Sequence, residues 1–274
     1  MRNLIFILMT GAAFWVASCS SSSKHAASKP AASTKGKHTL KVMSYNVHHC
    51  NPPSKEGYID IDAIAKVIER QEPDIVALQE IDVHTQRSGA NNQAEEIAYR
   101  LDMNYYFGKA IDYEGGEYGV AILSKYPLSE TVVNRLPTKT ETNGEPRILA
   151  TAKITLPDGS AIRFGSTHLD AQKEPGNRKL QMEEIVKITS SEKLPFVIAG
   201  DFNSTPESNE IQLLDKYFTR TCQTCAPTIP VVNPSKTIDF IAFTPTAEFS
   251  VTSNEVIMEP YASDHLPVVA VLKY

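Results

Sequence analysis

The sequence predicts a single mixed α/β domain with more strand than helix over Thr39–Tyr274. Short apolar runs with strand-like alternation are separated by runs in which apolar residues recur at helical spacing. No Ser-, Pro- or Gly-rich break divides this range, and we find no internal repeat in it. The chain has 274 residues and is 42% hydrophobic, which argues against wholesale disorder, a fibrous repeat and a polytopic membrane protein.

Residues 1–18 have the features of an export signal that is not part of the fold. Arg2 supplies a positive start, and the apolar run Leu4–Val16 is shorter than a membrane-spanning helix. The run closes on Val-Ala-Ser-Cys at positions 16–19, which resembles the lipobox of bacterial lipoproteins. That resemblance implies acylation of Cys19 and an exported protein anchored in a bacterial cell envelope, on its periplasmic or outer-surface face. An ordinary secretory peptide with an incidental cysteine is the alternative.

Residues 19–38 have the composition of a flexible tether, because they contain no large apolar side chain that could be buried in a core. Four lysines and no acid lie in this segment, so it either lies against anionic lipid head groups or is a solvated linker. These lysines and Arg2 are the only Lys or Arg residues before Thr39, which leaves 22 basic and 32 acidic residues from there on. The folded part therefore has a net charge of −10, against −5 for the whole chain, which argues against binding nucleic acid by charge alone.

The first half of the domain alternates between strand and helix. Leu40–Val47 alternates as a strand, and Asp74–Gln79 is a short apolar strand. Between them, apolar residues at 61, 64, 65 and 68 have helical spacing, with Asp60 available as the N-cap. Ala94–Leu101 is predicted to be a helix. A run of predicted strands follows at Tyr105–Gly108, Gly119–Ser124, Thr131–Arg135, Ile148–Leu156 and Ala161–Thr167.

The second half continues the same alternation. Pro-Asp-Gly at 157–159 is a hairpin turn signal between the last two of those strands. Leu180–Ile188 is predicted to be an amphipathic helix, and Glu207–Tyr217 a further helix. The short apolar run Phe196–Ala199 between them predicts a buried strand. The chain ends in three predicted strands, Thr237–Phe243, Ser250–Val256 and Val268–Leu272.

Five of the predicted apolar runs are bordered by polar residues. These polar clusters are Ser44-Tyr45-Asn46, Gln79-Glu80, Ser166-Thr167-His168, Gly200-Asp201-Phe202-Asn203 and Ser263-Asp264-His265. Taken singly, each has an ordinary explanation as a turn former or a solvated cap. Taken together, carboxylates, amides and two imidazoles would converge at one edge of a sheet.

This combination of side chains points to phosphate-ester hydrolysis. Oxygen-rich ligands with few nitrogens suit a hard divalent cation such as Mg²⁺ or Mn²⁺ better than zinc. The two histidines are then available for proton transfer and charge stabilisation, because an unperturbed imidazole titrates near pH ~6.5. Hydrolysis of a phosphate ester needs neutralised phosphate oxygens, an activated water and a stabilised leaving group.

An ordered set of polar residues also carries a resemblance to a known family: Asn46, Glu80, His168, Asp201-x-Asn203, Asp239 and Asp264-His265. In order and spacing this set is similar to that of the endonuclease/exonuclease/phosphatase superfamily, which includes deoxyribonucleases, bacterial sphingomyelinases and inositol-polyphosphate 5-phosphatases. The resemblance covers Leu40 to Tyr274. It implies a four-layer α/β/β/α sandwich, with two packed mixed β-sheets and outer helices. It also implies a metal-dependent phosphoesterase cleft at one rim.

The resemblance implies a metal site and an orienting pair. Glu80 corresponds to the principal metal-binding carboxylate, with Asn46 beside it and Asp264 contributing through water. His265 corresponds to the histidine that contacts phosphate and helps to activate the attacking water. Asp239 would accept the other N–H of that imidazole and fix its tautomer.

Four further residues are assigned to the phosphate site by the same resemblance. Asp201 would bind the nucleophilic water or a second metal, and Asn203 would bind a phosphate oxygen. His168 would donate to a phosphate oxygen as negative charge grows in the transition state. Tyr118, in the Glu-Tyr-Gly-Val-Ala-Ile-Leu-Ser run that begins at Glu117, would line the site. Either Asp201 or His265 could act as the general base.

Other polar residues near the motifs allow two interpretations each. His48 and His49 directly follow Asn46 and are either substrate-binding residues or solvated loop residues. Arg87 either contacts substrate phosphate as a fork-shaped donor or forms a salt bridge near Glu80. Arg147 and Arg178 are weaker candidates of the same type.

The four cysteines include one close pair. Cys222-x-x-Cys225 has no second ligand pair for zinc, and in an exported protein a local disulfide near Asp239 is one interpretation of it. Cys50 has no evident partner.

We therefore expect an enzyme that hydrolyses phosphate esters with Mg²⁺ or Mn²⁺. A small or lipid-borne phosphodiester fits the acidic domain and the membrane anchor. The alternatives are a secreted nuclease, for which DNA or RNA would be a substrate only, and a catalytically silent binding module on the same scaffold. The sequence indicates no obligate protein partner.

Overall fold

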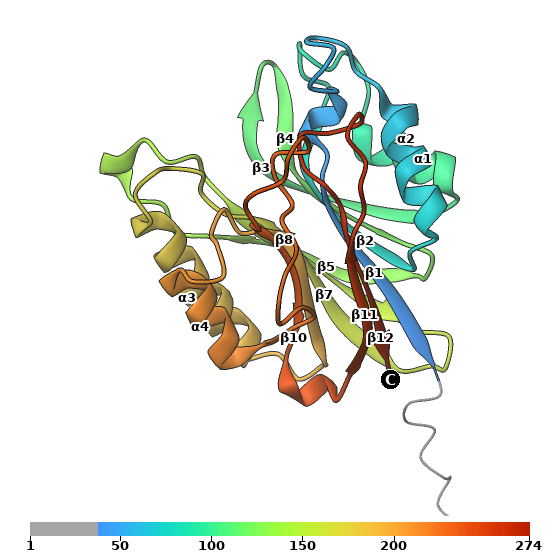
Figure 1. Ribbon diagram of the computed structural model, residues 1–274, viewed down its shortest axis with the longest axis vertical. Coiled ribbons are helices and arrows are strands. Elements are labelled where there is room, and N and C mark those ends of the chain that lie inside the picture. The colour runs from blue at the N-terminus through green and yellow to red at the C-terminus, as the bar shows by residue number, and fades with distance from the viewer. Residues whose placement is uncertain (1–37) are drawn as a thin grey trace, which may run out of the picture. The chain divides into compact units, whose positions relative to one another are not determined.

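Twelve strands within residues 38–274, the part of the chain that the structure describes, form two six-stranded sheets in this computed structural model (Figure 1). The first sheet has the order β11-β12-β1-β2-β4-β3. Its strands are β1 (Thr39–Asn46), β2 (Ile75–Val83), β3 (Asn104–Tyr113), β4 (Gly116–Ser124), β11 (Ser250–Val256) and β12 (Val268–Lys273). The pair β1/β2 is parallel and the other pairs are antiparallel, so this sheet is mixed.

The second sheet has the order β5-β6-β7-β8-β10-β9. Its strands are β5 (Leu128–Arg135), β6 (Ile148–Thr155), β7 (Ala161–His168), β8 (Phe196–Asp201), β9 (Thr219–Arg220) and β10 (Asp239–Phe243). This sheet is also mixed, because only the pair β7/β8 is parallel. A parallel pair in each sheet brings the carboxyl ends of neighbouring strands to the same edge.

Helices cover the outer face of each sheet (Figure 1). α1 (Ile61–Gln71) and α2 (Gln93–Leu101) pack on the first sheet, and α3 (Gly176–Ser190) and α4 (Asn209–Tyr217) pack on the second. Three short 3₁₀ turns are at His48–Cys50, Thr140–Thr142 and Pro245–Ala247. The predicted N-cap of α1 is confirmed, since the Asp60 carboxylate accepts a hydrogen bond from the backbone N–H of Ala63.

Alternating side chains place each strand between two apolar layers. In β1, Val42 lies in the core between the sheets, whereas Met43 lies in the core beneath α1 and α2. In β8, Val197 faces the other sheet and Ile198 faces α3 and α4. Because a strand points successive side chains to opposite faces, these runs are apolar throughout. The predicted four-layer α/β/β/α sandwich is confirmed.

Several predicted boundaries were wrong. β3 is longer than the predicted strand Tyr105–Gly108. The polar residues of β3 continue its pairing with β4 but do not add to the apolar pattern of the sequence. α3 begins at Gly176 rather than at the predicted Leu180, because its first turns bury polar side chains. The two-residue strand β9 was not predicted.

The predictions for residues 1–18 and 19–37, including acylation of Cys19, concern residues outside those that the structure describes. Residues 38–274 contain no helix that is long and apolar enough to span a membrane. Cys222 and Cys225 form a disulfide, which confirms that interpretation of the pair, and Cys50 is a buried free thiol.

Candidate active site

The strand ends that carry polar residues meet at one edge of the sandwich. Asn46 ends β1 and Glu80 lies near the end of the parallel neighbour β2. His168 and Asp201 end the parallel pair β7/β8, in register with each other. Asp239 begins the antiparallel strand β10 directly opposite Asp201. The topology therefore gathers side chains that lie up to 193 positions apart in the sequence, from Asn46 to Asp239.

Asn46 links the two sheets across this edge. Its Nδ2 donates to Oε1 of Glu80 at 3.0 Å and to Oδ2 of Asp201 at 3.1 Å. Its Oδ1 accepts the backbone N–H of His48 at 3.0 Å, and its backbone carbonyl accepts the hydroxyl of Ser263 at 2.7 Å. The three contacts of the side chain fix the orientation of the amide, which is itself buried.

Glu80 has an unusual backbone conformation. Its φ is +59°, at a point where the pairing of β2 with β4 shifts register between Leu78 and Ile81. A bulge of this kind turns a side chain out of the strand alternation, and here it directs the carboxylate toward Asn46. Burial disfavours the charged form, but the contacts of Glu80 with His49, His168 and Asn46 hold its pKa well below the ordinary value. The carboxylate is therefore ionised at neutral pH.

Asp239 and His265 form a buried pair. Nδ1 of His265 lies 3.0 Å from Oδ2 of Asp239. Burial opposes the charge on the imidazole, but the charge and hydrogen bond of Asp239 raise the pKa of His265 to about 10. The backbone N–H of His265 donates to the hydroxyl of Ser263, which ties the Ser-Asp-His segment to Asn46. His265 is therefore protonated and presents Nε2–H to the cluster.

Three nitrogens surround one oxygen of Asp201. Oδ2 of Asp201 lies 3.1 Å from Nδ2 of Asn46, 3.5 Å from Nε2 of His168 and 3.8 Å from Nε2 of His265. Burial and the nearby charge of Asp239 raise the pKa of Asp201 above its ordinary value. A carboxylate with a raised pKa that is surrounded by donors can accept a proton near neutral pH.

His168 is held from behind by a buried arginine. Nη1 of Arg147 lies 3.2 Å from Nδ1 of His168, and both side chains are almost completely buried. Burial and the charge of Arg147 lower the pKa of His168 well below its ordinary value. His168 and His265 are therefore in opposite protonation states at neutral pH.

Asn203 and Tyr118 complete the predicted set. The backbone N–H of Asn203 donates to Oδ1 of Asp201 at 2.8 Å, and its Nδ2 donates to the carbonyl of Leu169 at 3.0 Å. Tyr118 is buried on β4, and burial and the charge of Glu80 raise its pKa well above the ordinary value. Both residues lie beside the cluster where the sequence placed them.

The architecture and the cluster can be compared with known proteins. A model of the endonuclease/exonuclease/phosphatase family matches residues 43–265. This chain belongs to that family. As a member of it, the chain is a hydrolase that acts on phosphate ester bonds.

Relatives of this family member include proteins from bacteria and yeast. The chain is 26% identical over 247 residues to the uncharacterized protein YbhP of Escherichia coli K12, covering 85% of this chain and 95% of YbhP. It is 23% identical over 198 residues to the inositol phosphosphingolipids phospholipase C of Schizosaccharomyces pombe, covering 65% of this chain and 44% of that protein.

Solved structures share its fold. An endonuclease/exonuclease/phosphatase from Beutenbergia cavernae aligns with a TM-score of 0.72 at 24% identity, covering 86% of this chain and 71% of that one. The mannosyl-6-phosphatase Bt3783 of Bacteroides thetaiotaomicron aligns with a TM-score of 0.71 at 20% identity, covering 86% and 100%.

The donor set of this family member fits a divalent cation. Carboxylate oxygens of Asp201 and Asp239 and a ring nitrogen of His265 lie within 4.8 Å of one another, and the carboxylates are the donors because the protonated imidazole has no free lone pair. Oδ1 of Asp239 is buried and has no hydrogen-bond partner among residues 38–274, so it is available to a cation. Glu80 offers an ionised and partly accessible carboxylate on the other side of Asn46. Oxygen donors of this kind suit a hard cation.

Of the remaining predicted metal residues, Asp264 is half-buried and its Oδ1 accepts the Ser263 hydroxyl at 3.4 Å. Its charge is close enough to help raise the pKa of His265. Its predicted role as a metal ligand through water stays a prediction.

His48 and His49 lie in a left-handed turn beside Glu80. The residues from His48 to Cys50 all have positive φ, which is uncommon for side chains other than glycine. The turn brings Nδ1 of His49 to 3.8 Å from Oε2 of Glu80 and places Nδ1 of His48 2.9 Å from the carbonyl of Asn51. Strained backbone of this kind concentrates at functional sites. The sequence-based interpretation of both histidines as site residues stays a prediction, but His49 does contact the cluster.

Arg87 binds a buried acid that the sequence interpretation missed. Its Nε and Nη2 donate to the two oxygens of Asp82 at 2.7 and 2.9 Å, and its guanidinium stacks on Tyr113 and Tyr118. This matches the salt-bridge interpretation, since Asp82 lies two residues after Glu80. An acid within an apolar strand run was the signal that could have identified Asp82. Contact between Arg87 and substrate phosphate stays a prediction.

Arg178 does not belong to the cluster. Its Nη1 donates to the carbonyl oxygens of Asp170 and Gln172 and supports the loop after His168. Arg147, which was predicted as a candidate of the same type, contacts His168 directly. Spacing along the chain does not separate the two, because both lie in polar surroundings next to a regular element.

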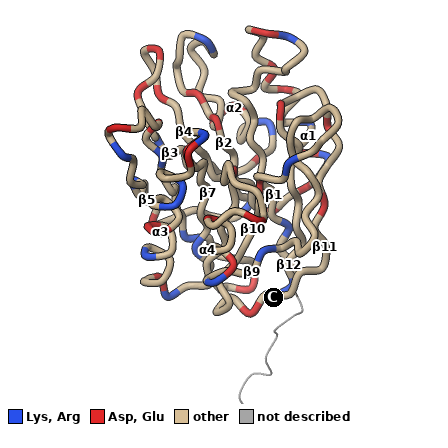
Figure 2. The backbone as a smooth tube through the Cα atoms, turned by 60° about the vertical axis from the view of Figure 1, so that its left-hand side comes forward, with Lys and Arg blue, Asp and Glu red and all other residues tan. Residues whose placement is uncertain are grey.

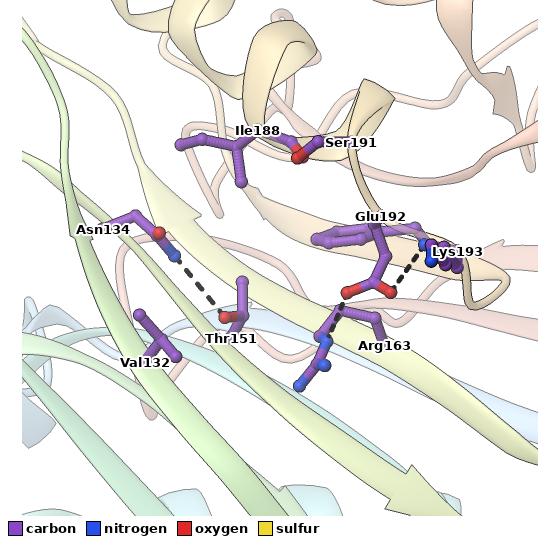
Figure 3. Close-up of a pocket in the computed structure, with 9 residues that line it drawn as sticks. Val132, Asn134, Thr151, Arg163, Ile188, Ser191, Glu192 and Lys193 are labelled. Carbon is purple, nitrogen blue, oxygen red and sulfur yellow. Dashed lines mark hydrogen bonds and ion pairs between the residues drawn. The ribbon is translucent and has the colours of Figure 1, made fainter.

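A separate cavity of about 350 Å³ lies away from the cluster (Figure 3). It adjoins Phe196 at the start of β8, whereas Asp201 ends that strand. Two of its charged groups pair with each other, because Nε of Arg163 donates to Oε2 of Glu192 at 2.7 Å. None of the predicted site residues lines it. This cavity therefore offers no alternative position for the predicted site residues.

Proposed function

We propose that this chain is a divalent-metal-dependent phosphodiesterase that cleaves a small or lipid-borne phosphodiester by direct attack of water on phosphorus. The observation that supports it best is the arrangement around Oδ2 of Asp201, where donors from Asn46, His168 and His265 converge. An acid with a raised pKa beside three nitrogens suits removal of a proton from water and binding of a phosphate oxygen.

In this proposal, the role of each residue follows from its protonation state. Asp201 acts as the general base, because its raised pKa matches a working pH near neutrality. His265 is held protonated by Asp239 and donates a hydrogen bond to a phosphate oxygen. His168 is neutral and donates through Nε2. No covalent intermediate is expected, because none of these groups is a nucleophile in this arrangement.

Mg²⁺ or Mn²⁺ is the proposed cofactor, held by Glu80 with Asn46 beside it and Asp264 through water. The ionised Glu80 carboxylate is the better first ligand, because a protonated His265 has no free lone pair. A bound cation would neutralise charge on the phosphoryl oxygens and stabilise the leaving oxygen. Asn46 would orient Glu80, and Asn203 and Tyr118 would line the phosphate site.

The net charge of the domain and the name of one relative support the proposed substrate class. The domain carries a net charge of −10, and basic positions are interspersed with acidic ones along the described chain (Figure 2). That distribution opposes long polyanions and tolerates a single phosphodiester. The yeast relative is named as a phospholipase C for inositol phosphosphingolipids, which supports a lipid-borne phosphodiester.

We also propose that the chain is an exported lipoprotein acylated at Cys19 and that it needs no obligate protein partner. The support is the apolar run that ends in Val-Ala-Ser-Cys. Fractionation of cells that produce the Cys19→Ala variant tests this proposal. We expect loss of the protein from the membrane fraction, and unchanged partitioning would contradict the anchor.

The enzymatic proposal is tested by hydrolysis of bis-p-nitrophenyl phosphate with Mg²⁺ or Mn²⁺, with and without EDTA. We expect metal-dependent release of nitrophenol, and severe loss of it in Glu80→Ala, Asp201→Ala and His265→Ala. The matched control is Asp112→Ala, because the Asp112 side chain is 88% exposed and pairs only with Lys109 in the described structure.

A substrate panel then separates the alternatives. Sphingomyelin, phosphoinositides, DNA and RNA are assayed under the same conditions. Preference for DNA or RNA would favour a nuclease, and absence of metal-dependent hydrolysis on every compound would favour a binding module. Full activity in all three site variants would overturn the site assignment.

A further inference from the structure

Arg147 is placed beside His168 by the backbone of the second sheet. It directly precedes β6, and β6 pairs with β7 so that Leu149 lies opposite Thr167. The hydroxyl of Thr167 donates to the carbonyl of Ile148 at 2.9 Å, which closes the end of this ladder. The arginine side chain is 6% exposed, so its contacts are made inside the protein and not in solvent.

One nitrogen of this arginine contacts two partners. Nη1 of Arg147 lies 3.2 Å from Nδ1 of His168 and 2.8 Å from Oε1 of Glu145. Glu145 lies in the loop before β6 and its side chain is 36% exposed. The contacts from Glu145 through Arg147 to His168 therefore start at the protein surface. Tyr118 is close enough to Arg147 to help raise the pKa of the arginine, although burial opposes its charge. The guanidinium therefore contacts Glu145 while it faces the imidazole.

This contact decides the tautomer of His168. A guanidinium has only donors and keeps its protons in proteins, so Nδ1 of His168 can bond to it only through a lone pair. Nδ1 then carries no proton, so the ring N–H is on Nε2. That nitrogen lies 3.5 Å from Oδ2 of Asp201, inside the cluster. In the other tautomer, two N–H donors would face each other in a buried place.

We propose that Arg147 is a positioning residue that fixes His168 in the Nε2–H tautomer and thereby directs a hydrogen-bond donor to the phosphate site, with Glu145 orienting the guanidinium. This inference deepens the proposed function and rests on it for the identity of the bound group. Arg147 acts through His168, so it sets the catalytic rate and not the binding of substrate.

The tautomer is measured by ¹⁵N NMR of protein labelled in its histidine rings. The His168→Gln variant identifies the signals of His168. We expect the wild-type protein to show an unprotonated Nδ1 and a protonated Nε2 at this residue. Arg147→Met should give a mixture of tautomers, whereas Arg147→Lys keeps a donor and should restore the wild-type pattern.

The kinetic readout uses the same variants on bis-p-nitrophenyl phosphate. We expect Arg147→Met to lower kcat by about 10- to 100-fold, as loss of an outer partner of a site group usually does, with KM changed little. Glu145→Gln should have a smaller effect in the same direction. The control is Arg163→Met, which removes another mostly buried arginine that pairs with Glu192 and Glu130 near the start of β7, at the other end of that strand from His168. That variant should keep both the tautomer and kcat.

Three results would overturn the proposal. The first is a wild-type protein with a protonated Nδ1 at His168. The second is an unchanged tautomer in Arg147→Met together with a raised KM and weaker inhibition by inorganic phosphate, which would make Arg147 a direct phosphate ligand. The third is an unchanged kcat in a folded Arg147→Met protein. If Arg147→Met does not fold, the tautomer of His168 in the wild-type protein and the kcat of Glu145→Gln still test the proposal.

Failure of the proposed function is distinguishable from failure of this inference. A wild-type protein that hydrolyses no phosphodiester contradicts the proposed function, but the NMR measurement still reports whether Arg147 sets the tautomer of His168.

Discussion

Nδ1 of His265 lies 3.0 Å from Oδ2 of Asp239, and both side chains are almost completely buried. The carboxylate keeps the imidazole charged in an environment that would otherwise favour its neutral form. The pair joins two segments that are distant in the sequence, the start of β10 and the loop before β12. His265 therefore depends on Asp239 for both its orientation and its charge.

Asp239→Asn should reduce phosphodiester hydrolysis by roughly 10²- to 10³-fold, the usual cost of losing one hydrogen-bond donor to a developing negative charge. The amide keeps the shape but removes the charge that holds His265 protonated. The measurement is kcat on bis-p-nitrophenyl phosphate, with Asp112→Asn as the exposed control. Equal activity in both variants would contradict the role of the pair.

The same pair predicts that stability falls as the pH rises. The pKa of His265 is about 10 in the folded state, above the unfolded value of about 6.5. The folded state therefore binds the extra proton between these values, and the stabilisation is present below pH ~6.5 and lost as pH rises toward ~10. Between pH 7 and 8.5 we expect the free energy of unfolding to fall by about 1 to 2 kcal/mol.

Urea unfolding in EDTA at the two pH values measures this change. His265→Gln should show almost no difference between them. Measurements stay below pH 9 because burial also raises the pKa of the Cys50 thiol, which would add to the fall at higher pH. Equal wild-type stability at pH 7 and 8.5 would refute the expected linkage.

Mg²⁺ should raise the unfolding temperature of the protein, because a ligand that binds only the folded state stabilises it by about 2.7 kcal/mol at 100 times its Kd. Glu80→Gln should lose most of this shift, since the ionised carboxylate is the proposed first ligand. Glu130→Gln is the matched control, because Glu130 pairs with Lys153 and Arg163 away from the cluster. A full Mg²⁺ shift in Glu80→Gln would place the cation elsewhere.

Removal of the disulfide should lower the free energy of unfolding but leave kcat almost unchanged. Cys222 and Cys225 are three positions apart, and closing so short a loop contributes about 2 kcal/mol in the chain-entropy model. Asp239 is held independently by its pairing with Asp201 in the sheet. The double variant Cys222→Ser/Cys225→Ser should therefore unfold more easily but keep its kcat at 25 °C. A loss of kcat greater than tenfold would show that the loop supports the catalytic cluster.

The sequence predicted the strand-end residues well, because apolar runs mark strands and parallel strands end at one edge. Asn46, Glu80, His168 and Asp201 could be placed together on that ground alone. His265 was grouped with them as part of the polar cluster before the last strand, whereas Asp239, the first residue of β10, came from the family resemblance alone. The structure brings all six residues to one edge.

Several features of the site could not be predicted, because they depend on tertiary contacts. The positive φ of Glu80 arises from a register shift against β4, which lies about forty residues further on. The contact between Arg147 and His168 needs the pairing of two strands in the other sheet. α3 began earlier than predicted because Asn177, Arg178 and Gln181 are buried polar residues, which an apolar pattern does not reveal.

β1 begins at Thr39, at the end of the sandwich away from the catalytic edge, and ends at Asn46 within it. His38 and Tyr274 exchange backbone hydrogen bonds at that far end, so both chain ends of the described domain leave there (Figure 1). Eight residues of strand cover roughly 26 Å, at about 3.3 Å each. A domain immobilised by either end on a bead or electrode would thus hold the edge that contains Asn46 away from the support, and a lipid in the supporting layer would contact that edge only after the domain had reoriented.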